Sequence, residues 1–190
     1  MKESGRSALE ARNEAFRRLG RNLYLFQLIE QQLKHLVVHS SISGHVEELP
    51  DQVATKTKAA RKTAMGALAE QFATVIFSDH GGIGPNTVDS TKPSISFSFR
   101  VEADEQFVKQ RKKELKRLVI QRNRLVHNIA ADIQPDDTAQ WLALGVFLDE
   151  QRVDLIAEYD RLRLLLKELS EAAQESVLAI ESALFAPEHT

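Results

Sequence analysis

The sequence contains no cysteine among its 190 residues, which excludes disulfide bonds and thiol chemistry. Long apolar runs are also missing, because charged residues interrupt every stretch that approaches the length of a membrane span. Residues 1–16 lack the apolar centre of a secretory signal. Neither sign of charge dominates, with 25 Lys and Arg against 27 Asp and Glu, so only local basic patches could attract a polyanion. We therefore expect a soluble cytoplasmic protein that does not bind membranes.

The residues that are present predict long amphipathic helices. In the first helix, about 7–39, apolar residues recur at alternating steps of three and four: Phe16, Leu19, Leu23, Phe26, Leu33 and Val37. The next segment, 39–52, is predicted as a loop or short turn. A second, alanine-rich helix is predicted over 54–77, with one stripe formed by Ala60, Ala64, Leu68, Phe72 and Val75.

Two further helices are predicted in the second half of the chain. The third begins among the acidic residues 102–105, which suit the positive end of a helix, and continues to about residue 131. After "IQPDD" (133–137) ends it, Asp136 with Asp137 or Thr138 can cap the fourth. The fourth, 141–185, carries a heptad-like apolar seam: Leu155, Tyr159, Leu162, Leu166, Leu169, Ala173, Val177, Ile180 and Leu184. Such a helix is long for a small bundle, so we expect either a break near Ser170 or an extension that forms a partner interface.

A change of composition separates the second and third helices. Residues 78–93 are rich in turn formers, and "SISFSFRV" (94–101) alternates apolar with polar residues as a half-buried strand does. The glycines of "GGIGP" (81–85) are followed by proline and not by a helix, which disfavours a phosphate-binding loop. We predict a single all-α domain, 1–190, built as an antiparallel bundle of four to five helices with a small β-hairpin or extended insertion around 78–101.

Two charged residues occupy positions where their helices should face the core. Glu30 fills the expected apolar position between Phe26 and Leu33. Arg122 does the same in the third helix, where the stripe runs Val108, Arg111, Leu115, Leu118, Arg122, Leu125 and Ile129. Burying either charge alone would cost several kcal/mol, roughly, and pairing offsets part of that cost. We therefore expect Glu30 to meet Arg122 or Arg124 across a helix interface.

His127 is the candidate for proton transfer near this arginine. It shares a helix face with Asn123 and Ile120, so the Asn123 amide can hydrogen-bond the imidazole. Arg122 and His127 are five residues apart, which turns their directions about 140° from each other on a straight helix. A histidine on such a face is more often a packed core or interface residue, and arginines often extend from apolar faces towards water.

The stretch "RNRLVHN" resembles the signature of the HEPN superfamily, an Arg followed by four to six residues and a His, with a polar residue directly after the Arg. Arg122, Asn123 and His127 match it. The predicted helical bundle, the place of the motif late in the third helix, the acid at Glu30 and "FLDEQ" (147–151) near the start of the last helix are similar to HEPN proteins as well.

The resemblance implies a metal-independent endoribonuclease that needs no cofactor, acts as a toxin or antiphage effector, and works as a homodimer with both motifs at the interface. His127 would act as acid or base, Arg122 would bind the phosphate, Asn123 would hold the imidazole or contact phosphate, and Glu30 would orient an arginine. A cognate antitoxin or inhibitor protein would be a further partner. Some HEPN toxins carry a tyrosine two residues after the histidine as the target of an antitoxin. Ile129 stands there, which speaks against that mode of control.

Two other groups of residues could bind ligands. Basic runs occur at 56–62 and 109–117, and such runs usually form a solvated face. If they flank the motif, the residues expected to contact the RNA backbone are Arg124, Lys113, Lys116 and Arg117. His35 and His39 have the spacing of two zinc ligands, with His45 within chain reach, but no further ligand stands out, so we expect no metal site.

Three hypotheses follow for the function. The first is an HEPN-type endoribonuclease. The second is a catalytically inactive HEPN-like helical module that binds RNA or a protein. The third is a helical protein in which the motif occurs by chance. A solvent-accessible cleft that holds Arg122 and His127 together would favour the first, and a sealed His127 would favour the others.

Overall fold

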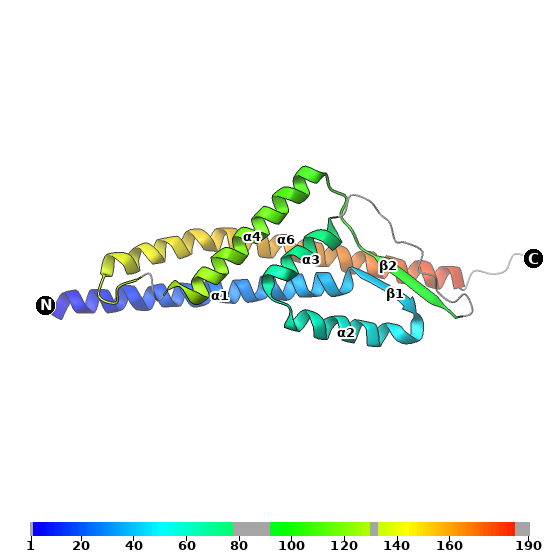
Figure 1. The fold of residues 1–190 in the computed structure, drawn as a ribbon, viewed down its shortest axis with the longest axis horizontal. Helices are drawn as coiled ribbons and strands as arrows, with labels where there is room; N and C mark the ends of the chain where they lie inside the picture. Colours follow the sequence, from blue (N-terminus) through cyan, green and yellow to red (C-terminus); the bar gives the residue numbers. More distant parts are fainter. Residues whose placement is uncertain (1, 78–91, 130–132, 185–190) are drawn as a thin grey trace, which may run out of the picture. The chain divides into compact units, whose positions relative to one another are not determined.

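The computed structural model describes residues 2–77, 92–129 and 133–184, and these form a helical protein with one two-stranded sheet (Figure 1). The α-helices in these ranges are α1 (Lys2–His39), α2 (Leu49–Lys62), α3 (Met65–Ile76), α4 (Glu105–His127) and α6 (Thr138–Leu184). The predicted all-α class with a small β element is confirmed. Within the described ranges, no helix has both the length and the apolar character needed to cross a membrane.

The chain divides into two compact units. The first combines Met1–Gln31 with Lys113–Leu162, and the second combines Gln32–Lys112 with Arg163–Thr190. Helices α1, α4 and α6 each contribute to both units. The expectation of a single domain over 1–190 stays a prediction.

In the first unit, α1 and α6 run side by side in the same direction. The rings of Phe16 and Trp141 lie 5.3 Å apart. Two turns further along α1, the Asn22 amide donates a 2.7 Å hydrogen bond to the carbonyl of Leu148. Both contacts advance towards the C-termini of the two helices, so the two helices are parallel.

Helix α4 runs in the opposite direction along α6, as expected of an antiparallel bundle. Arg161 lies 3.9 Å from Glu114, whereas Arg117 further along α4 is paired at 2.5 Å with the earlier Asp154 of α6. The Asp104 carboxylate accepts a 2.7 Å hydrogen bond from the backbone N–H of Phe107 and so caps the start of α4. The expected acidic N-terminal end of this helix therefore has a structural role.

The buried stripe of α1 differs from the predicted one. Its buried positions are Ala15, Asn22, Phe26, Ile29, Leu33, Leu36 and Val38. The predicted stripe began at Phe16, which lies beside the Trp141 ring with 49% of its surface exposed, while the small Ala15 takes the buried position. A shift of one residue turns a helix face by about 100°, so several of the predicted core positions of α1 were wrong.

In the second unit, a short sheet joins two segments that are distant in sequence. β1 (Ser41–His45) pairs antiparallel with β2 (Ser94–Ser98), in a register that sets Ser43 opposite Ser96. The strand predicted within 94–101 is confirmed. Its partner comes from the segment predicted as a loop, which also contains the 3₁₀ turn η1 (Val46–Glu48). Residues 78–91 of the expected insertion lie outside the described residues.

The alanine-rich segment forms two helices, and the prediction of one helix over 54–77 was wrong. Thr63 and Ala64 both have extended backbone, with ψ angles of 130° and 149°. The buried face of α3 includes Leu68 and Phe72 of the predicted stripe, and its full set is Met65, Leu68, Ala69, Phe72, Ala73 and Ile76. Ile76 in turn accepts a 2.8 Å backbone hydrogen bond from Val101, which ties α3 to the segment after β2.

Helix α6 is continuous, so of the two alternatives for its length the break near Ser170 is absent, and this residue lies exposed within the helix. The Asp137 carboxylate caps its start by accepting a 3.1 Å hydrogen bond from the N–H of Gln140. The buried hydrophobic residues of α6 recur every seven positions at Trp141, Leu148, Leu155, Leu162 and Leu169. Beyond Leu169 the predicted seam is open, since Val177 is 54% exposed.

Candidate functional site

The last turns of α4 carry the RNRLVHN motif in the first unit. Leu118 and Leu125 are buried, and Arg122 lies half-buried on the stripe between them. His127 is exposed at the last residue of the helix. Because α4 is continuous from Arg122 to His127, the two side chains leave the helix in directions about 140° apart.

An open hollow of about 380 Å³ lies over this end of α4. It is lined by Ile120, Asn123, Arg124, His127 and Asn128. Arg124 and His127 are three residues apart and therefore share one helix face. The hollow thus combines an imidazole, a guanidinium and two amides in reach of solvent, which are groups that hydrogen-bond phosphate and transfer protons.

Arg122 is not among the residues that line the hollow with His127. Its Nη1 donates a 3.2 Å hydrogen bond to the Oδ1 of Asn123, and Asn123 does line the hollow. We expected the Asn123 amide to hold the imidazole, but the observed hydrogen bond of its oxygen is with Arg122. Asn123 therefore connects the half-buried arginine to the exposed group around His127.

Arg124 also borders a second, apolar pocket in the first unit. Its guanidinium carbon lies 5.8 Å from the centre of the Phe147 ring, in the range of a cation–π interaction. This pocket, of about 310 Å³, is otherwise lined mainly by aliphatic side chains of α4, α6 and the segment between them, among them Leu125, Ile129 and Leu144. A flat apolar group beside the motif could therefore enter next to Arg124.

Glu30 does not occupy the core position that the sequence analysis assigned to it. Ile29 is the fully buried residue at this level of α1, and Glu30 is half-buried one position further on. The error follows directly from the one-residue shift of the α1 stripe. The pairing of Glu30 with Arg122 or Arg124 stays a prediction.

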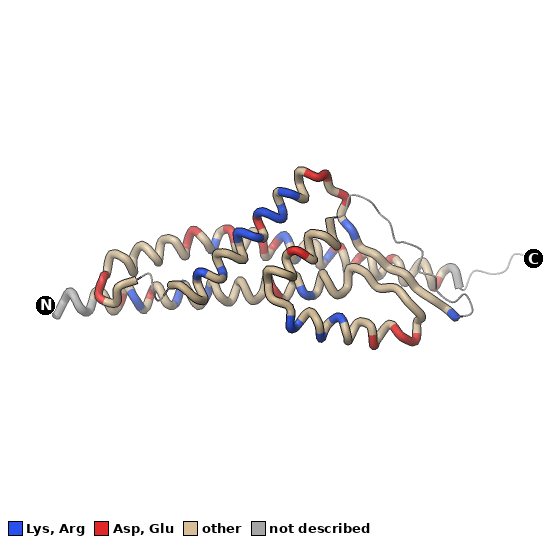
Figure 2. The backbone as a smooth tube through the Cα atoms, viewed as in Figure 1, with Lys and Arg blue, Asp and Glu red and all other residues tan. Residues whose placement is uncertain are grey.

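Lysines and arginines recur along α4 from the motif back towards its start (Figure 2), and most of them are exposed, whereas Arg111 is buried and Arg122 is half-buried. Lys113 and Lys116 lie on the solvent side of the first unit. Arg117 is also exposed, but its guanidinium is paired with the carboxylate of Asp154 at 2.5 Å. A phosphate at Arg117 would have to compete with this carboxylate. A phosphate at Lys113 or Lys116 would not have to displace Asp154.

Sequence analysis missed the most buried polar pair of the first unit. Asn22 is fully buried, and its amide nitrogen donates to the Leu148 carbonyl and, at 3.1 Å, to Oε1 of Gln151. Gln151 is 3% exposed and lies on α6 between Leu148 and Leu155 of the seven-residue pattern. Asn22 lies four residues before Phe26 and therefore on the same face of α1, which could have predicted its burial. The predicted stripe began at Phe16 and did not include it.

The histidines of α1 form a stacked pair in the second unit. The rings of His35 and His39 lie 4.2 Å apart. Burial lowers the pKa of His39 from its usual value, and the neighbouring positive charges of His35 and Lys56 lower it further. Within residues 2–77, 92–129 and 133–184, no three His, Asp or Glu side chains gather as a metal site would require. The glycines at 81–85 lie outside the described residues.

Comparisons with protein-family models, with curated proteins and with solved structures gave no match to this chain. The assignment of a function therefore rests on the residues and their geometry.

Proposed function

We propose that this protein is a metal-independent endoribonuclease of the HEPN type. The observation that carries the proposal is the solvent-accessible hollow in which Asn123, Arg124 and His127 meet, with Arg122 hydrogen-bonded to its edge through Asn123. The sequence pattern that resembles HEPN proteins and the exposure of its histidine support the same function. A sealed His127 would have opposed it.

The proposed reaction is attack of an RNA 2′-hydroxyl on the adjacent phosphorus. The 2′-hydroxyl loses its proton to a base as the new O–P bond forms, and the 5′-oxygen gains a proton as the old O–P bond breaks. An imidazole can accept or donate a proton near neutral pH, and we assign proton transfer in this reaction to His127. Guanidinium groups stabilise the charge that develops on the phosphorane, for which Arg122 and Arg124 are the candidates. The products carry a 2′,3′-cyclic phosphate and a 5′-hydroxyl.

The RNA backbone is expected to follow α4 away from the hollow. Lys113 and Lys116 are exposed on this helix, and each phosphate that they neutralise releases counterions. Binding should therefore weaken steeply as salt rises. Arg117 contributes less in this proposal, because Asp154 already neutralises it.

The direct test is incubation of the purified protein with total RNA in excess chelator, followed by sequencing of the ends. Cleavage that leaves cyclic phosphates, and that spares DNA of the same sequence, is the expected result. His35→Ala is the matched control for His127→Ala, since it removes an exposed histidine from the other unit. Inertness of the wild-type protein on every RNA would contradict the proposal.

The second candidate is an HEPN-like module that binds RNA or a protein without cleaving. The observation that favours it is that Arg122 does not line the hollow beside His127. Under this alternative, the protein retains RNA in a filter assay, and Lys113→Ala with Lys116→Ala weakens retention, but the ends of the RNA stay intact.

A further inference from the structure

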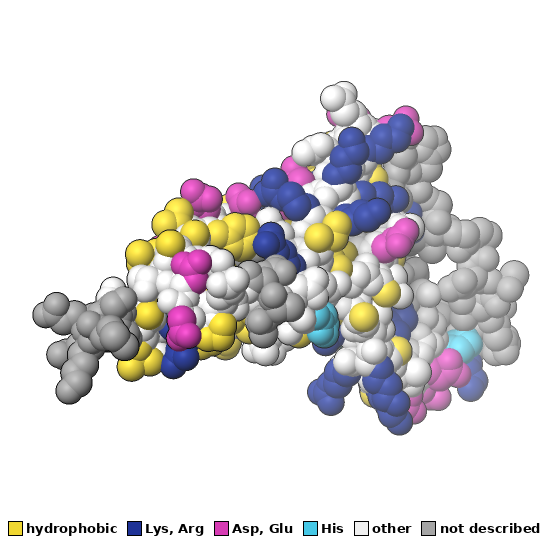
Figure 3. All heavy atoms as spheres, turned by 60° about the vertical axis from the view of Figure 1, so that its left-hand side comes forward, with side chains coloured by type: hydrophobic (Ala, Val, Ile, Leu, Met, Phe, Trp, Pro, Cys, Tyr) yellow, Lys and Arg dark blue, Asp and Glu magenta, His cyan; other side chains and the backbone are white. Residues whose placement is uncertain are grey.

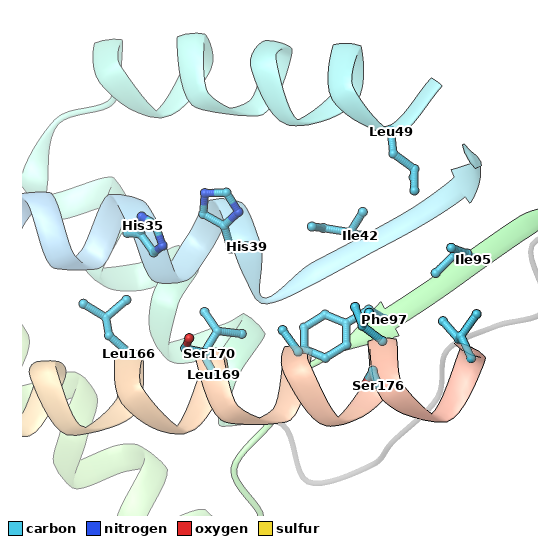
Figure 4. Close-up of a pocket in the computed structure, with 13 residues that line it drawn as sticks. His35, His39, Ile42, Leu49, Ile95, Phe97, Leu166, Leu169, Ser170 and Ser176 are labelled. Carbon is cyan, nitrogen blue, oxygen red and sulfur yellow. The ribbon is translucent and has the colours of Figure 1, made fainter. Parts of the chain in front are cut away.

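A cavity in the second unit is lined by residues that have no part in the proposed nuclease function. It measures about 360 Å³, within the range of about 300–1,000 Å³ typical of small-molecule sites. Its walls come from the end of α1, from β1 and β2, from the start of α2 and from the last part of α6 (Figure 4). Ile42, Ile95 and Phe97 extend into it from the two strands.

The apolar floor of this cavity is the part of the α6 seam that stays exposed among the described residues. Leu169 is the last buried residue of the seven-residue pattern. Val177 and Ile180 continue the same face, line the cavity and are 54% and 36% exposed. Exposing such side chains to water is unfavourable by about 25 cal/mol per Å², so a bound apolar chain would be stabilised here.

The end of the cavity that lies on α1 is polar and has a preference for negative charge. His35 and His39 line it with stacked rings, and Lys56 lies close enough to affect the charge of His39. Lys56 is held in place by a 2.6 Å hydrogen bond from its Nζ to the carbonyl of Ser41. Among the described residues, the charged or titratable groups that act on His39 are His35 and Lys56. The strands and α6 present uncharged side chains to the cavity, among them Phe97 and Ser170.

We propose that this cavity binds a monocarboxylate with an unbranched apolar chain, that is, a medium-chain fatty acid. The carboxylate accepts hydrogen bonds from the imidazoles of His35 and His39 and faces Lys56, and the chain lies between Phe97 on β2 and Val177 on α6. An anion at this end favours protonated His39, so binding takes up a proton and tightens as pH falls from 8 to 6.

The first experiment compares three ligands of equal chain length by calorimetry with the full chain, each below the concentration at which it aggregates. Decanoate should bind at least about ten-fold more tightly than decanol, and decyltrimethylammonium should bind more weakly than decanol. Equal affinities for decanoate and decanol, or no binding of decanoate by the folded protein, would overturn the proposal. This comparison uses only the wild-type protein, so a misfolded variant cannot decide it.

Two pairs of variants then locate the site. Val177→Glu should abolish decanoate binding, whereas Leu178→Glu, an exposed neighbour that does not line the cavity, should leave it unchanged. His39→Leu should reduce decanoate to the affinity of decanol and remove the pH dependence, with His127→Leu as the control outside the cavity. Circular dichroism identifies the variants that fold. Unchanged decanoate binding in folded Val177→Glu would place any binding elsewhere and contradict the proposal.

Discussion

His127 and Arg122 differ in their surroundings, and this difference predicts different effects when each is replaced by alanine. His127 is exposed, so His127→Ala should leave the melting temperature unchanged. It should lower RNA cleavage by about a hundred-fold to ten-thousand-fold, the usual cost of removing a positioned acid or base. Arg122 is half-buried and hydrogen-bonded to Asn123, so Arg122→Ala should lower both cleavage and the melting temperature. Cleavage assays and thermal melts on the same preparations measure both effects.

Full activity of His127→Ala would remove the histidine from the mechanism and favour the non-catalytic module. An Arg122→Ala protein as stable as the wild type would instead show that the half-buried guanidinium contributes little to folding. Arg124→Ala provides the comparison, because Arg124 is exposed in the same helix and lines the hollow beside His127.

The buried Asn22–Gln151 pair predicts a non-additive effect on stability. Asn22→Ala should lower the free energy of unfolding by about 1–3 kcal/mol, because it leaves the Leu148 carbonyl and the Gln151 amide buried without this donor. The double variant Asn22→Leu with Gln151→Leu should cost less than the sum of the two single leucine variants. Urea unfolding of the wild type, the two single leucine variants and the double leucine variant measures this coupling, and strict additivity would contradict it.

For single residues, the sequence indicated candidates for chemistry but not which of them are buried. The motif residues could be selected because Arg, Asn and His stood among apolar neighbours. The wrong assignment of Glu30 to the core and the omission of Asn22 from it have the same cause. Both assignments depend on the rotation of α1 about its axis, and Phe16 was a misleading reference for that rotation.

Strand β1 depends on a backbone conformation that favours glycine. Gly44 has a φ of 150°, and a Cβ at this position would lie 2.6 Å from the side-chain nitrogen of Gln52. Gly44→Ala should therefore destabilise the protein by about 1–3 kcal/mol. Gly20→Ala is the matched control, since it lies exposed in α1 with no atom within 4 Å of the added Cβ, and it should stabilise the helix by up to about 1 kcal/mol. Thermal melts that moved in the same direction would contradict this prediction.

The contact between α1 and α6 in the first unit should make stability fall in acid. A hydrogen bond from Arg17, together with Arg18, lowers the pKa of Glu14 from 4.5 to about 2, and Arg21 and Arg18 lower the pKa of Asp149. A carboxylate with a lowered pKa stabilises the fold above its ordinary pKa and loses this contribution as pH falls through the lowered value. The melting temperature should therefore decline between about pH 5 and pH 2.

The variant Asp149→Asn should have a smaller decline over this range, because Arg18 and Arg21 lose their shared carboxylate at every pH. Asp160→Asn, an exposed acid on the same helix, is the control and should keep the wild-type profile. An identical acid profile for Asp149→Asn would show that other groups cause the decline.

Secondary structure could be predicted where periodicity was long and uninterrupted. Helices α1, α4 and α6 and the Asp137 cap of α6 follow from such patterns. The break at Thr63 could not be predicted, because no proline marks it and alanine favours a helix on both sides. Strand β1 was missed for a related reason, since it forms only by pairing with β2, about fifty residues away in the sequence.

For the whole molecule, we expect a two-fold dimer. Hydrophobic side chains are exposed over the first unit (Figure 3), among them Leu142, Val146 and Val153 on one face of α6, with 59%, 58% and 68% exposure. A two-fold pairing buries such a face against its own copy, and it would bring two motifs together. Sedimentation at micromolar concentration should show a dimer, and Val146→Glu should yield a monomer. A monomeric wild-type protein, or a dimer of Val146→Glu, would contradict this interface.

The helical class of this protein followed from the sequence because helix formation and capping depend on residues within about four positions of one another. The motif near the end of α4 was identified by the same local spacing. Long-range packing decided the rest: the buried face of α1, the pairing of β1 with β2, the continuity of α6 and the separation of Arg122 from the hollow beside His127. A one-residue error in a long helix moves a side chain by about 100°, and only the packing of neighbouring elements determines which face is buried.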